Sequence, residues 1–477
     1  MKMYYLRFRK LICATILGMV LFTSCENDDN QPVTGTITIS VAENSVAEDV
    51  GSIAVTVTAG TTFPMDVVIT YEVSGSASSG EDFEALSGLA TLPAGDTSLV
   101  QNLIILDDSE VESAEQIIIR ITAIDGAQDL VGGDGEITLT ITDNDSFAFE
   151  NGVLVLHEGN FGAGNASVSF LPDDLSDVQN GIFKSVNTVD SWGDTAQSIT
   201  FNGDMAYIIV NNSQKIEVVN RYTFTSVTTI GGSGSTDFLN PRYMAVANGK
   251  GYVTNWGDGT NPDDDYVAIV NLETNTVESK IPVAEGPEAL VANETTVYVA
   301  HQGGFNQNNI VSVIDVTSNE VSTTVTVADR PNSLQLDTNG DLWVLSGGNP
   351  IWTGNETAGQ LDKISTADNA VVQTLAFEVS EHPGALSLEG SNLYYYLSGA
   401  VFKMDDMATA LPETAELSDL NWADMAVNDG KLYGVDAKDF VSNGSLEIYD
   451  LGDNSMVTSK AVSVIPTGVY FNGTADR

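Results

Sequence analysis

The sequence predicts an all-β protein in which a β-sandwich is followed by a seven-bladed β-propeller. Residues 35–145 show apolar positions that alternate with polar ones, with Gly, Asp and Ser turns about every ten residues, which is typical of a sandwich. Farther along the 477-residue chain, the stretch Tyr252–Asn255 returns as Tyr298–His301, a little under fifty residues later. Each such unit carries four short strand signals, and a period of this size indicates propeller blades.

Residues 1–24 are predicted to be a signal peptide. Four basic residues precede an apolar core at 11–22, and Cys25 follows directly after the segment. The apolar run is too short to span a bilayer. The segment resembles a bacterial lipoprotein signal, which implies that Cys25 carries lipid and holds the mature chain on a membrane. The alternative is an ordinary secretory signal with an incidental cysteine.

Residues 25–34 are predicted to form an acidic linker. Its cluster of Glu26, Asp28 and Asp29 resembles the tag that sends some Gram-negative lipoproteins to the outer cell surface. This resemblance implies a lipid-anchored protein of the outer membrane that is exposed at the cell surface. A solvated linker with no targeting role is the alternative.

Composition limits the partners of the mature chain. The two cysteines of the sequence are Cys13, inside the signal, and Cys25, so no disulfide is expected and burial must supply the stability. Without residues 1–24, 14 basic residues face 66 acidic ones, a formal charge of −52. So acidic a surface repels nucleic acid and anionic lipid and favours cations.

Residues 35–146 are predicted to form the sandwich, with about seven strands and no helix. The strand signals are ITISVAE, SIAVTVTAG, DVVITYEVSG, GLATLPAG, LVQNLIILDD, QIIIRITAI and EITLTITDND. Carboxylates follow the ends of these strands, and oxygen ligands from several loops are how proteins usually hold calcium. Asp and Glu are also common at hairpin ends for turn chemistry alone.

The same segment resembles a Calx-beta domain over nearly its whole length. The matching pieces include Val46–Glu48, Gly80–Phe83, Pro93–Gly95, the pair Asp107 and Asp108, and the closing Asp143–Asp145. The resemblance implies a structural calcium ion that stiffens a spacer. The ligands it implies are Glu48, Asp82, Asp107, Asp108, Glu112, Glu115, Asp143 and Asp145.

Residues 147–477 are predicted to form the propeller. Besides the two best copies, weaker copies of the repeat begin near Val153, Met205, Leu342, Leu393 and Leu432, which makes seven. The last strand signal, at 465–471, has no partner in its own copy and is expected to pair beside 153–157, which would close the ring and remove its exposed edges. The repeats resemble those of YVTN-type (YncE-like) bacterial propellers.

Propeller topology predicts which loops share a face. If the strands of a blade are lettered A to D from the centre outwards, the entries into strand A and the loops from B to C lie at the same end. Asparagines, aromatics and an arginine on a concave surface suit a neutral or amphipathic small ligand, although Asn and Gly also serve turns. The predicted ligand-binding residues are Phe161, Gln197, Asn212, Arg242, Tyr243, Trp256, His301, Phe305, Trp352 and Trp422, and Phe440 lies in the last B-to-C loop.

A wider resemblance covers residues 152 to about 345, through phrases such as VLVLHEGNFGAGNASVSF and PRYMAVANGKGYVTNWG. They are similar to the surface propeller lipoproteins that sit beside TonB-dependent transporters, some of which capture cobalamin. The resemblance implies that this protein binds a small nutrient, such as a corrinoid-like compound, and passes it to such a transporter. The preceding Calx-beta domain departs from that pattern.

Two other classes of function remain open. A calcium-stiffened adhesion or matrix protein that binds protein or glycan without catalysis is the main alternative. An enzyme such as a propeller lactonase is the third, and the expectation is that the protein is not an enzyme. The three histidines, His157, His301 and His382, are spread over three blades, and motifs for a nucleophile elbow, HExxH or a phosphate-binding loop are missing from the sequence.

Overall fold

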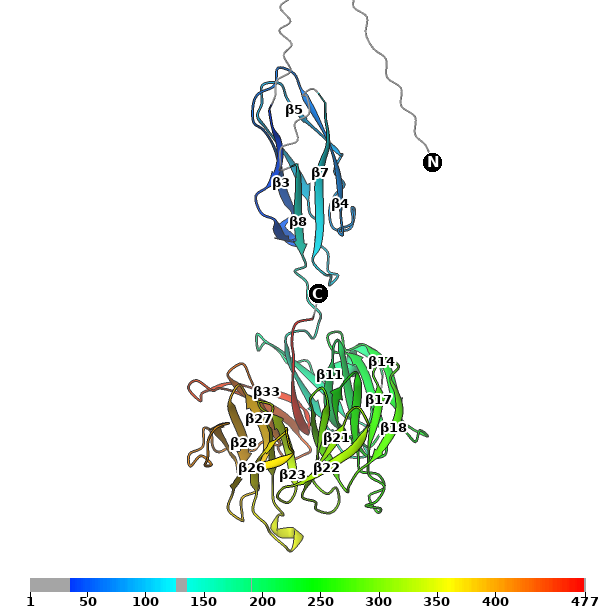
Figure 1. Ribbon diagram of the computed structural model, residues 1–477, viewed down its shortest axis with the longest axis vertical. Coiled ribbons are helices and arrows are strands. Elements are labelled where there is room, and N and C mark those ends of the chain that lie inside the picture. Colours follow the sequence, from blue (N-terminus) through cyan, green and yellow to red (C-terminus); the bar gives the residue numbers. More distant parts are fainter. Residues whose placement is uncertain (1–34, 126–134, 190, 476–477) are drawn as a thin grey trace, which may run out of the picture. The chain divides into compact units, whose positions relative to one another are not determined.

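The computed structural model describes residues 35–125, 135–189 and 191–475, and it divides the chain into two compact units at Asp145 and Ser146. Nearly all regular structure in the described residues is β-strand (Figure 1). No described helix is long and apolar enough to cross a membrane. The predicted signal peptide, the acidic linker and Cys25 lie outside the described residues.

The first unit is a sandwich of two sheets, as the alternating pattern predicted. One sheet has the order β1-β3-β6 and the other β2-β8-β7-β4-β5. All pairs are antiparallel except β2 with β8, which run parallel. The strands are β1 (Ile37–Val41), β2 (Ser45–Ala47), β3 (Ser52–Ala59), β4 (Val67–Gly75), β5 (Leu89–Leu92), β6 (Ser98–Ile104), β7 (Glu115–Asp125) and β8 (Glu136–Thr142).

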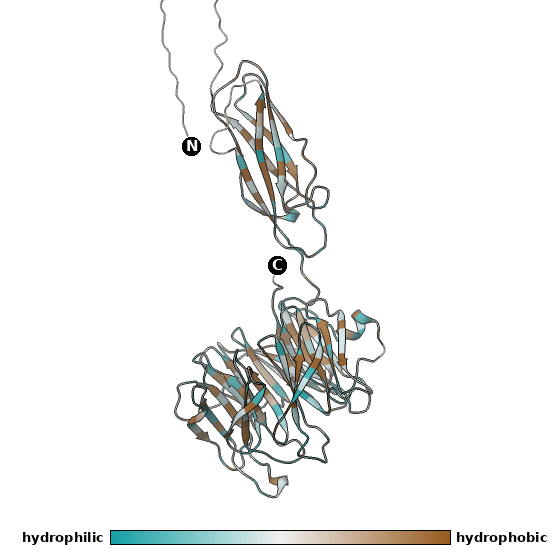
Figure 2. Cartoon of the chain, turned by 45° about the vertical axis from the view of Figure 1, so that its right-hand side comes forward, coloured by the Kyte–Doolittle hydropathy of each residue, from teal (hydrophilic) through white to brown (hydrophobic). Residues whose placement is uncertain are grey.

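Alternation along these strands builds the core of the sandwich. In β3, every second residue from Ile53 to Ala59 is buried, and β7 buries Ile117, Ile119 and Ile121 in the same way. Figure 2 shows the resulting apolar and polar bands along the strands. One turn of 3₁₀ helix, η1 (Glu48–Val50), follows β2 and corrects the expectation of a helix-free unit.

The second unit is a ring of seven sheets, each a blade, which confirms the predicted propeller. The first strands of successive sheets contact one another around a central axis, so they are the inner strands A. Five blades have four strands. These are β11 (Ala196–Asn202), β12 (Met205–Val210), β13 (Lys215–Asn220), β14 (Ser226–Gly231); β15 (Pro241–Ala247), β16 (Lys250–Asn255), β17 (Tyr266–Asn271), β18 (Thr276–Pro282); β19 (Pro287–Ala292), β20 (Thr296–His301), β21 (Ile310–Asp315), β22 (Glu320–Thr326); β23 (Pro331–Leu336), β24 (Leu342–Ser346), β25 (Gln360–Ser365), β26 (Ala370–Ala376); and β30 (Asp424–Asn428), β31 (Lys431–Asp436), β32 (Asn443–Asp450), β33 (Met456–Val464).

Two blades have three strands among the described residues. One contains β27 (Gly384–Glu389), β28 (Asn392–Leu397) and β29 (Ala400–Asp405), with a single bridge from Val401 to Leu417 beyond β29. The other is the closing blade, which contains β34 (Pro466–Asn472), β9 (Gly152–His157) and β10 (Ser167–Pro172). Where a fourth strand would continue the closing blade, the chain forms the short helix α1 (Ile182–Asn187).

The ring closes as the sequence predicted, because β34 pairs antiparallel with β9 as the inner strand of the first blade. Pro466 lies opposite His157 at one end of this pair, and Asn472 lies opposite Gly152 at the other. The chain therefore enters the propeller at the end opposite the B-to-C loops. Those loops include the one that carries the 3₁₀ turn η2 (Ile351–Thr353).

A recurring backbone step begins the inner strands. Asn240, Gly286, Arg330 and Ile465 all have positive φ and stand directly before the proline that opens strand A. A left-handed conformation is unusual for a residue other than Gly, and more so for a β-branched one such as Ile465. The step turns the chain sharply into the inner ring and fixes which residues of strand A face the central axis.

Candidate functional site

One end of the sandwich gathers all eight carboxylates that the sequence singled out. Glu48 lies in η1 after β2, Asp82 lies in the loop after β4, and the others follow β6, precede or begin β7, or follow β8. Because β6 and β8 end where β7 begins, these segments meet at one end of the unit.

The carboxylates form two groups whose oxygen atoms lie within 4.8 Å of one another, Glu48 with Asp143 and Asp145, and Asp82 with Glu112 and Glu115. The groups are joined, since Asp143 Oδ2 accepts a hydrogen bond from the Glu112 backbone N–H at 2.8 Å. Asp107 and Asp108 border them. The charge of Asp108 raises the pKa of both Glu48 and Glu112, and Asn144 Nδ2 reaches Asp107 Oδ1 at 3.5 Å.

Burial and mutual repulsion make this end unfavourable without a cation. Glu48 is only 6% exposed, and its pKa rises to about 7 because burial, then Asp143 and then Asp145 disfavour its charge. Burial raises the pKa of Glu115 to about 7 as well, and so does a hydrogen bond that its protonated carboxyl donates to Asp82. Glu48 Oε1 and Asp145 Oδ2 are buried and have no hydrogen-bond partner. Unpartnered carboxylate oxygens from several loops fit a hard cation such as calcium.

The propeller presents large apolar side chains at the end where the B-to-C loops lie. Phe161 is 81% exposed, Phe305 67% and Trp352 70%, and each comes from a different blade. The loop after β31 adds Phe440. Its backbone carbonyl accepts a hydrogen bond from Asn160 Nδ2, next to Phe161, at 2.9 Å. We call Phe161, Phe305, Ile351, Trp352, Phe440 and Val441 the apolar rim.

The prediction did not include Ile351 and Val441. Each stands next to an aromatic residue in its loop, and only the aromatic residue was considered as a ligand contact. The prediction also counted one arginine at this end where the structure has two. Arg242 lies over the ring of Trp256 at 4.1 Å, and Arg330 lies over the ring of Trp352 at 5.8 Å. The repeat could have revealed Arg330, because it stands before Pro331 as Gly286 stands before Pro287.

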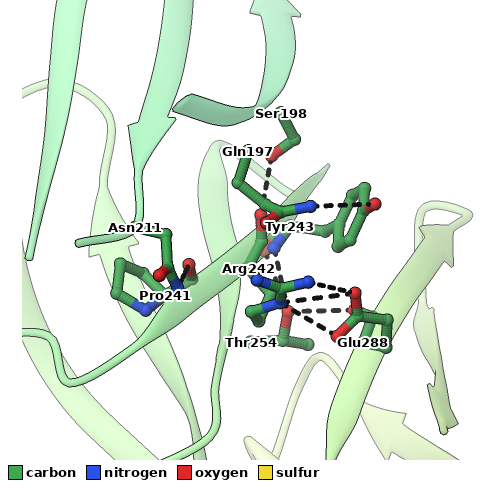
Figure 3. Close-up of polar contacts among 8 residues, drawn as sticks. All are labelled: Gln197, Ser198, Asn211, Pro241, Arg242, Tyr243, Thr254 and Glu288. Carbon is green, nitrogen blue, oxygen red and sulfur yellow. Dashed lines mark hydrogen bonds and ion pairs between the residues drawn. The ribbon is translucent and has the colours of Figure 1, made fainter. Parts of the chain in front are cut away.

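A buried ion pair lies on the inner strands, between β15 and β19 (Figure 3). Arg242 donates to Glu288 through its terminal nitrogen at 2.8 Å and through Nε at 3.0 Å, a two-pronged geometry. Beside it, Gln197 Nε2 donates to the phenol oxygen of Tyr243 at 3.2 Å. Arg242 is therefore charge-compensated, and its guanidinium face is already covered by Trp256.

The interior of the ring also holds Asp424 and Tyr470. Burial raises the pKa of Asp424 to about 7, and it raises the pKa values of Tyr243 and Tyr470 well above the ordinary range. The charge of Asp424 contributes to the shifts of both tyrosines, which places the three groups near one another. The interior thus combines the Arg242–Glu288 ion pair with an aspartate that is about half ionised at neutral pH.

Two residues predicted for the ligand-binding face are instead buried in the blades, which corrects the prediction. His301 is completely buried, and its Nε2 lies 2.8 Å from Ser312 Oγ, just as His157 Nε2 lies 2.8 Å from Ser169 Oγ in the first blade. The last residue of strand B thus makes a structural bond to strand C. Trp422 is 6% exposed and donates through Nε1 to Glu447 Oε2 at 2.9 Å.

Asn212 lies exposed in the loop after β12 and bonds to the segment before β11. Its Nδ2 donates to Asp194 Oδ2, whose oxygen also accepts the backbone N–H of Gly162. Of the predicted face, the structure therefore leaves Phe161, Phe305, Trp352 and Asn212 exposed. Gln197, Arg242, Tyr243 and Trp256 lie deeper and are partly covered.

Comparisons with solved structures give distant likenesses. Hydrazine synthase of Kuenenia stuttgartiensis is 16% identical, with a TM-score of 0.44, over 57% of this chain and 88% of that one. Apo AztD from Citrobacter koseri is 10% identical, with a TM-score of 0.43, over 67% and 96%. The apo form of the Calx CBD1 domain is 24% identical, with a TM-score of 0.21, over 23% and 99%.

Family models match both units. The model described as the Calx-beta domain matches residues 28–145, which confirms the resemblance seen in the sequence. The model described as a domain of unknown function, DUF5074, matches residues 151–438, from the first strand of the closing blade into the last four-stranded blade. Because this second match spans more than half of the chain, the protein belongs to the DUF5074 family, here with a Calx-beta domain before the propeller.

Proposed function

We propose that the propeller captures a small amphipathic nutrient on the end that carries the apolar rim, and that the sandwich is a calcium-binding spacer. A corrinoid-like compound is the leading candidate for the nutrient, because of the resemblance to cobalamin-capturing propellers. The protein would then be lipid-anchored through Cys25 at the surface of the outer membrane and would pass its ligand to a TonB-dependent transporter.

The observation that carries the proposal is the apolar rim itself. Its six side chains come from the B-to-C loops of four blades, and each is at least 60% exposed. Burying one such side chain is worth about 1.5–3 kcal/mol, so leaving six of them in water at one end is a cost unless a ligand covers them. A corrinoid offers both a flat macrocycle to cover aromatic rings and peripheral amides to hydrogen-bond with the asparagines between them.

The three histidines of the propeller favour binding rather than catalysis. Burial lowers the pKa of His157 to about 3 and that of His301 to about 4, so neither accepts a proton near neutral pH. Both rings already contact serine hydroxyls. His382 Nδ1 lies 2.8 Å from the carbonyl oxygen of Gly347, a contact that ties this third ring to the loop after β24. We propose on this basis that the protein is not an enzyme.

The end at which the chain enters the propeller supports a tethered receptor. The register of β34 with β9 places the entry of the chain at the end of the propeller opposite the apolar rim. A tether attached at that end leaves the rim open to solvent. The two carboxylate groups of the sandwich supply the oxygen ligands for calcium, and the chain before residue 35 supplies the predicted anchor.

Isothermal titration of residues 26–477 with cyanocobalamin, in the presence of calcium, tests the ligand. We expect binding that Phe305→Ala and Trp352→Ala each weaken at least tenfold. Met407→Ala is the matched control, because Met407 is 71% exposed but follows β29 at the opposite end of the propeller. Absence of heat at micromolar protein, or equal weakening by the control, would reject the corrinoid assignment.

Binding of a protein or glycan partner is the second candidate function, and the observation behind it is the spread of the apolar rim over four blades. Such a spread suits a broad partner surface as well as a small ligand. If cyanocobalamin gives no heat, the same variants should be tested for adhesion to matrix proteins on coated surfaces. Loss of adhesion in Trp352→Ala but not in Met407→Ala would move the protein to this class.

A further inference from the structure

A cavity of about 450 Å³ lies at the seam between the last blade and the closing blade, away from the central axis. Its walls come from the start of β10, from α1 and the segment before β11, and from the facing ends of β32 and β33. Small-molecule sites in proteins commonly have volumes of about 300–1,000 Å³.

The cavity exists because the closing blade lacks a regular outer strand. After β10, one bridge from Phe170 to Gln179 continues the sheet, and α1 then occupies the outer position. Phe183 of α1 stacks on Trp192 with ring centroids 5.0 Å apart and planes inclined by 29°. The two rings form an apolar wall.

Two side chains that line this cavity carry hydrogen-bond donors without a partner, whereas Asn165 and Ser191 already donate to other groups. Trp192 is only 4% exposed, and its Nε1 has no hydrogen-bond partner. Ser167 Oγ is also buried and unpartnered. Such groups are unfavourable unless a ligand or water bonds to them. Both side chains line the cavity.

The charge of the cavity is opposite to that of the chain. Lys184 lines it, and no Asp or Glu is among its described lining residues, although the sequence carries 66 acidic residues against 18 basic ones. Among the described residues, Lys184 forms no ion pair. A cation, an indole N–H and a hydroxyl beside an aromatic wall suit an anion that has an apolar body.

We propose that this seam cavity binds a small monocarboxylate with an apolar body. The carboxylate accepts from Lys184, Trp192 Nε1 and Ser167, and the apolar body lies against Phe183 and Trp192. The site is independent of the apolar rim, so it holds whether or not the propeller captures a corrinoid.

Phenylacetate tests the site on the full mature chain, with phenethylamine and 2-phenylethanol as the cationic and neutral probes of the same size. Indole N–H resonances report binding, because the chain has five tryptophans and Trp192→Phe identifies the signal of Trp192. We expect phenylacetate to shift that signal with a dissociation constant in the millimolar range or tighter. The two other probes should bind at least tenfold more weakly.

Two variants decide the role of the donors. Lys184→Met, which changes an exposed residue and should fold normally, should weaken phenylacetate binding at least tenfold, and Ser167→Ala should weaken it severalfold. Lys250→Met is the matched control, since Lys250 lies in another blade and pairs with Glu278 at 2.8 Å. Equal binding of phenylacetate and phenethylamine, an unmoved Trp192 signal, or unchanged binding in Lys184→Met would overturn the proposal.

Discussion

The carboxylate end of the sandwich and the inner ring of the propeller manage buried charge in opposite ways. The sandwich brings the carboxylate oxygens of Glu48, Asp143 and Asp145 within 4.8 Å of one another. The propeller buries Glu288 against Arg242 in a two-pronged pair. The carboxylates of the sandwich could hold an ion from solution, whereas Glu288 of the propeller has its counter-charge in Arg242. The difference predicts that the stability of the sandwich depends on the calcium concentration, whereas the stability of the propeller does not.

Removal of the internal counter-charge is the largest expected effect. Arg242→Leu should lower the free energy of unfolding of the propeller by about 3–5 kcal/mol, because Glu288 is left buried and unpaired. The double variant Arg242→Leu with Glu288→Leu should be more stable than either single variant. Urea unfolding followed by tryptophan fluorescence measures this, since all five tryptophans lie in the propeller. A double variant that is less stable than both single ones would show that the pair is not the source of the cost.

Removal of calcium should affect only the sandwich. An ion present at 100 times its dissociation constant contributes about 2.7 kcal/mol, so a chelator should lower the unfolding temperature of a domain of this size by about 10 °C or more. Calorimetry with and without chelator measures the shift, and tryptophan fluorescence follows the propeller as an internal control. A shift of the propeller transition alone would contradict the comparison.

The buried histidines should make the propeller sensitive to acid. Burial lowers the pKa of His301 to about 4, whereas the unfolded chain has an ordinary value near 6.5. The unfolded state therefore binds more protons, and stability falls as the pH drops from about 6.5 towards 4. Relative to His301→Asn, wild type should lose about 2 kcal/mol between pH 7 and pH 4.5. Parallel pH profiles for the two proteins would mean that His301 ionises freely in the folded state.

The smallest expected effect has opposite signs in the presence and absence of calcium. Glu48→Gln should stabilise the calcium-free sandwich by about 1 kcal/mol, because it removes one of several like charges. The same variant should weaken calcium binding at least tenfold, since it removes a ligand. Calorimetry and calcium titration measure the two effects, with the exposed Glu72→Gln of β4 as control. Destabilisation of the calcium-free variant would indicate that Glu48 is held by other contacts.

The carboxylate end was predictable because each acidic residue stands beside a strand whose position in the sandwich follows from alternation and the family pattern. Strand ends that meet bring their neighbours together, so Asp107 or Asp143 could be placed without knowledge of side-chain direction. The calcium ion itself stays a prediction. The propeller was equally predictable, because its repeats define strands B and C in every blade.

Side-chain direction within a blade was not predictable. His301 was predicted to lie in the loop after strand B, but it is the last residue of that strand and faces Ser312 inside the blade. Residues 173–195 carry no repeat, so nothing in the sequence indicated α1 or the cavity beside it. Arg330 was missed because it has positive φ directly before a proline, a position where Gly is the usual residue. The prediction therefore did not place a second arginine side chain at this end of the propeller.

The pairing of β34 with β9 has a consequence for synthesis of the chain. Asn472 and Phe149, which this closure brings into hydrogen-bond contact, are 323 positions apart in the chain. The edge of β9 stays unpaired until nearly the whole chain has been made. A chain that stops short of residue 466 would present that edge permanently to other chains and to proteases. Because the closing strand is the last strand of the chain, only a chain that includes it can form a closed, protease-resistant ring.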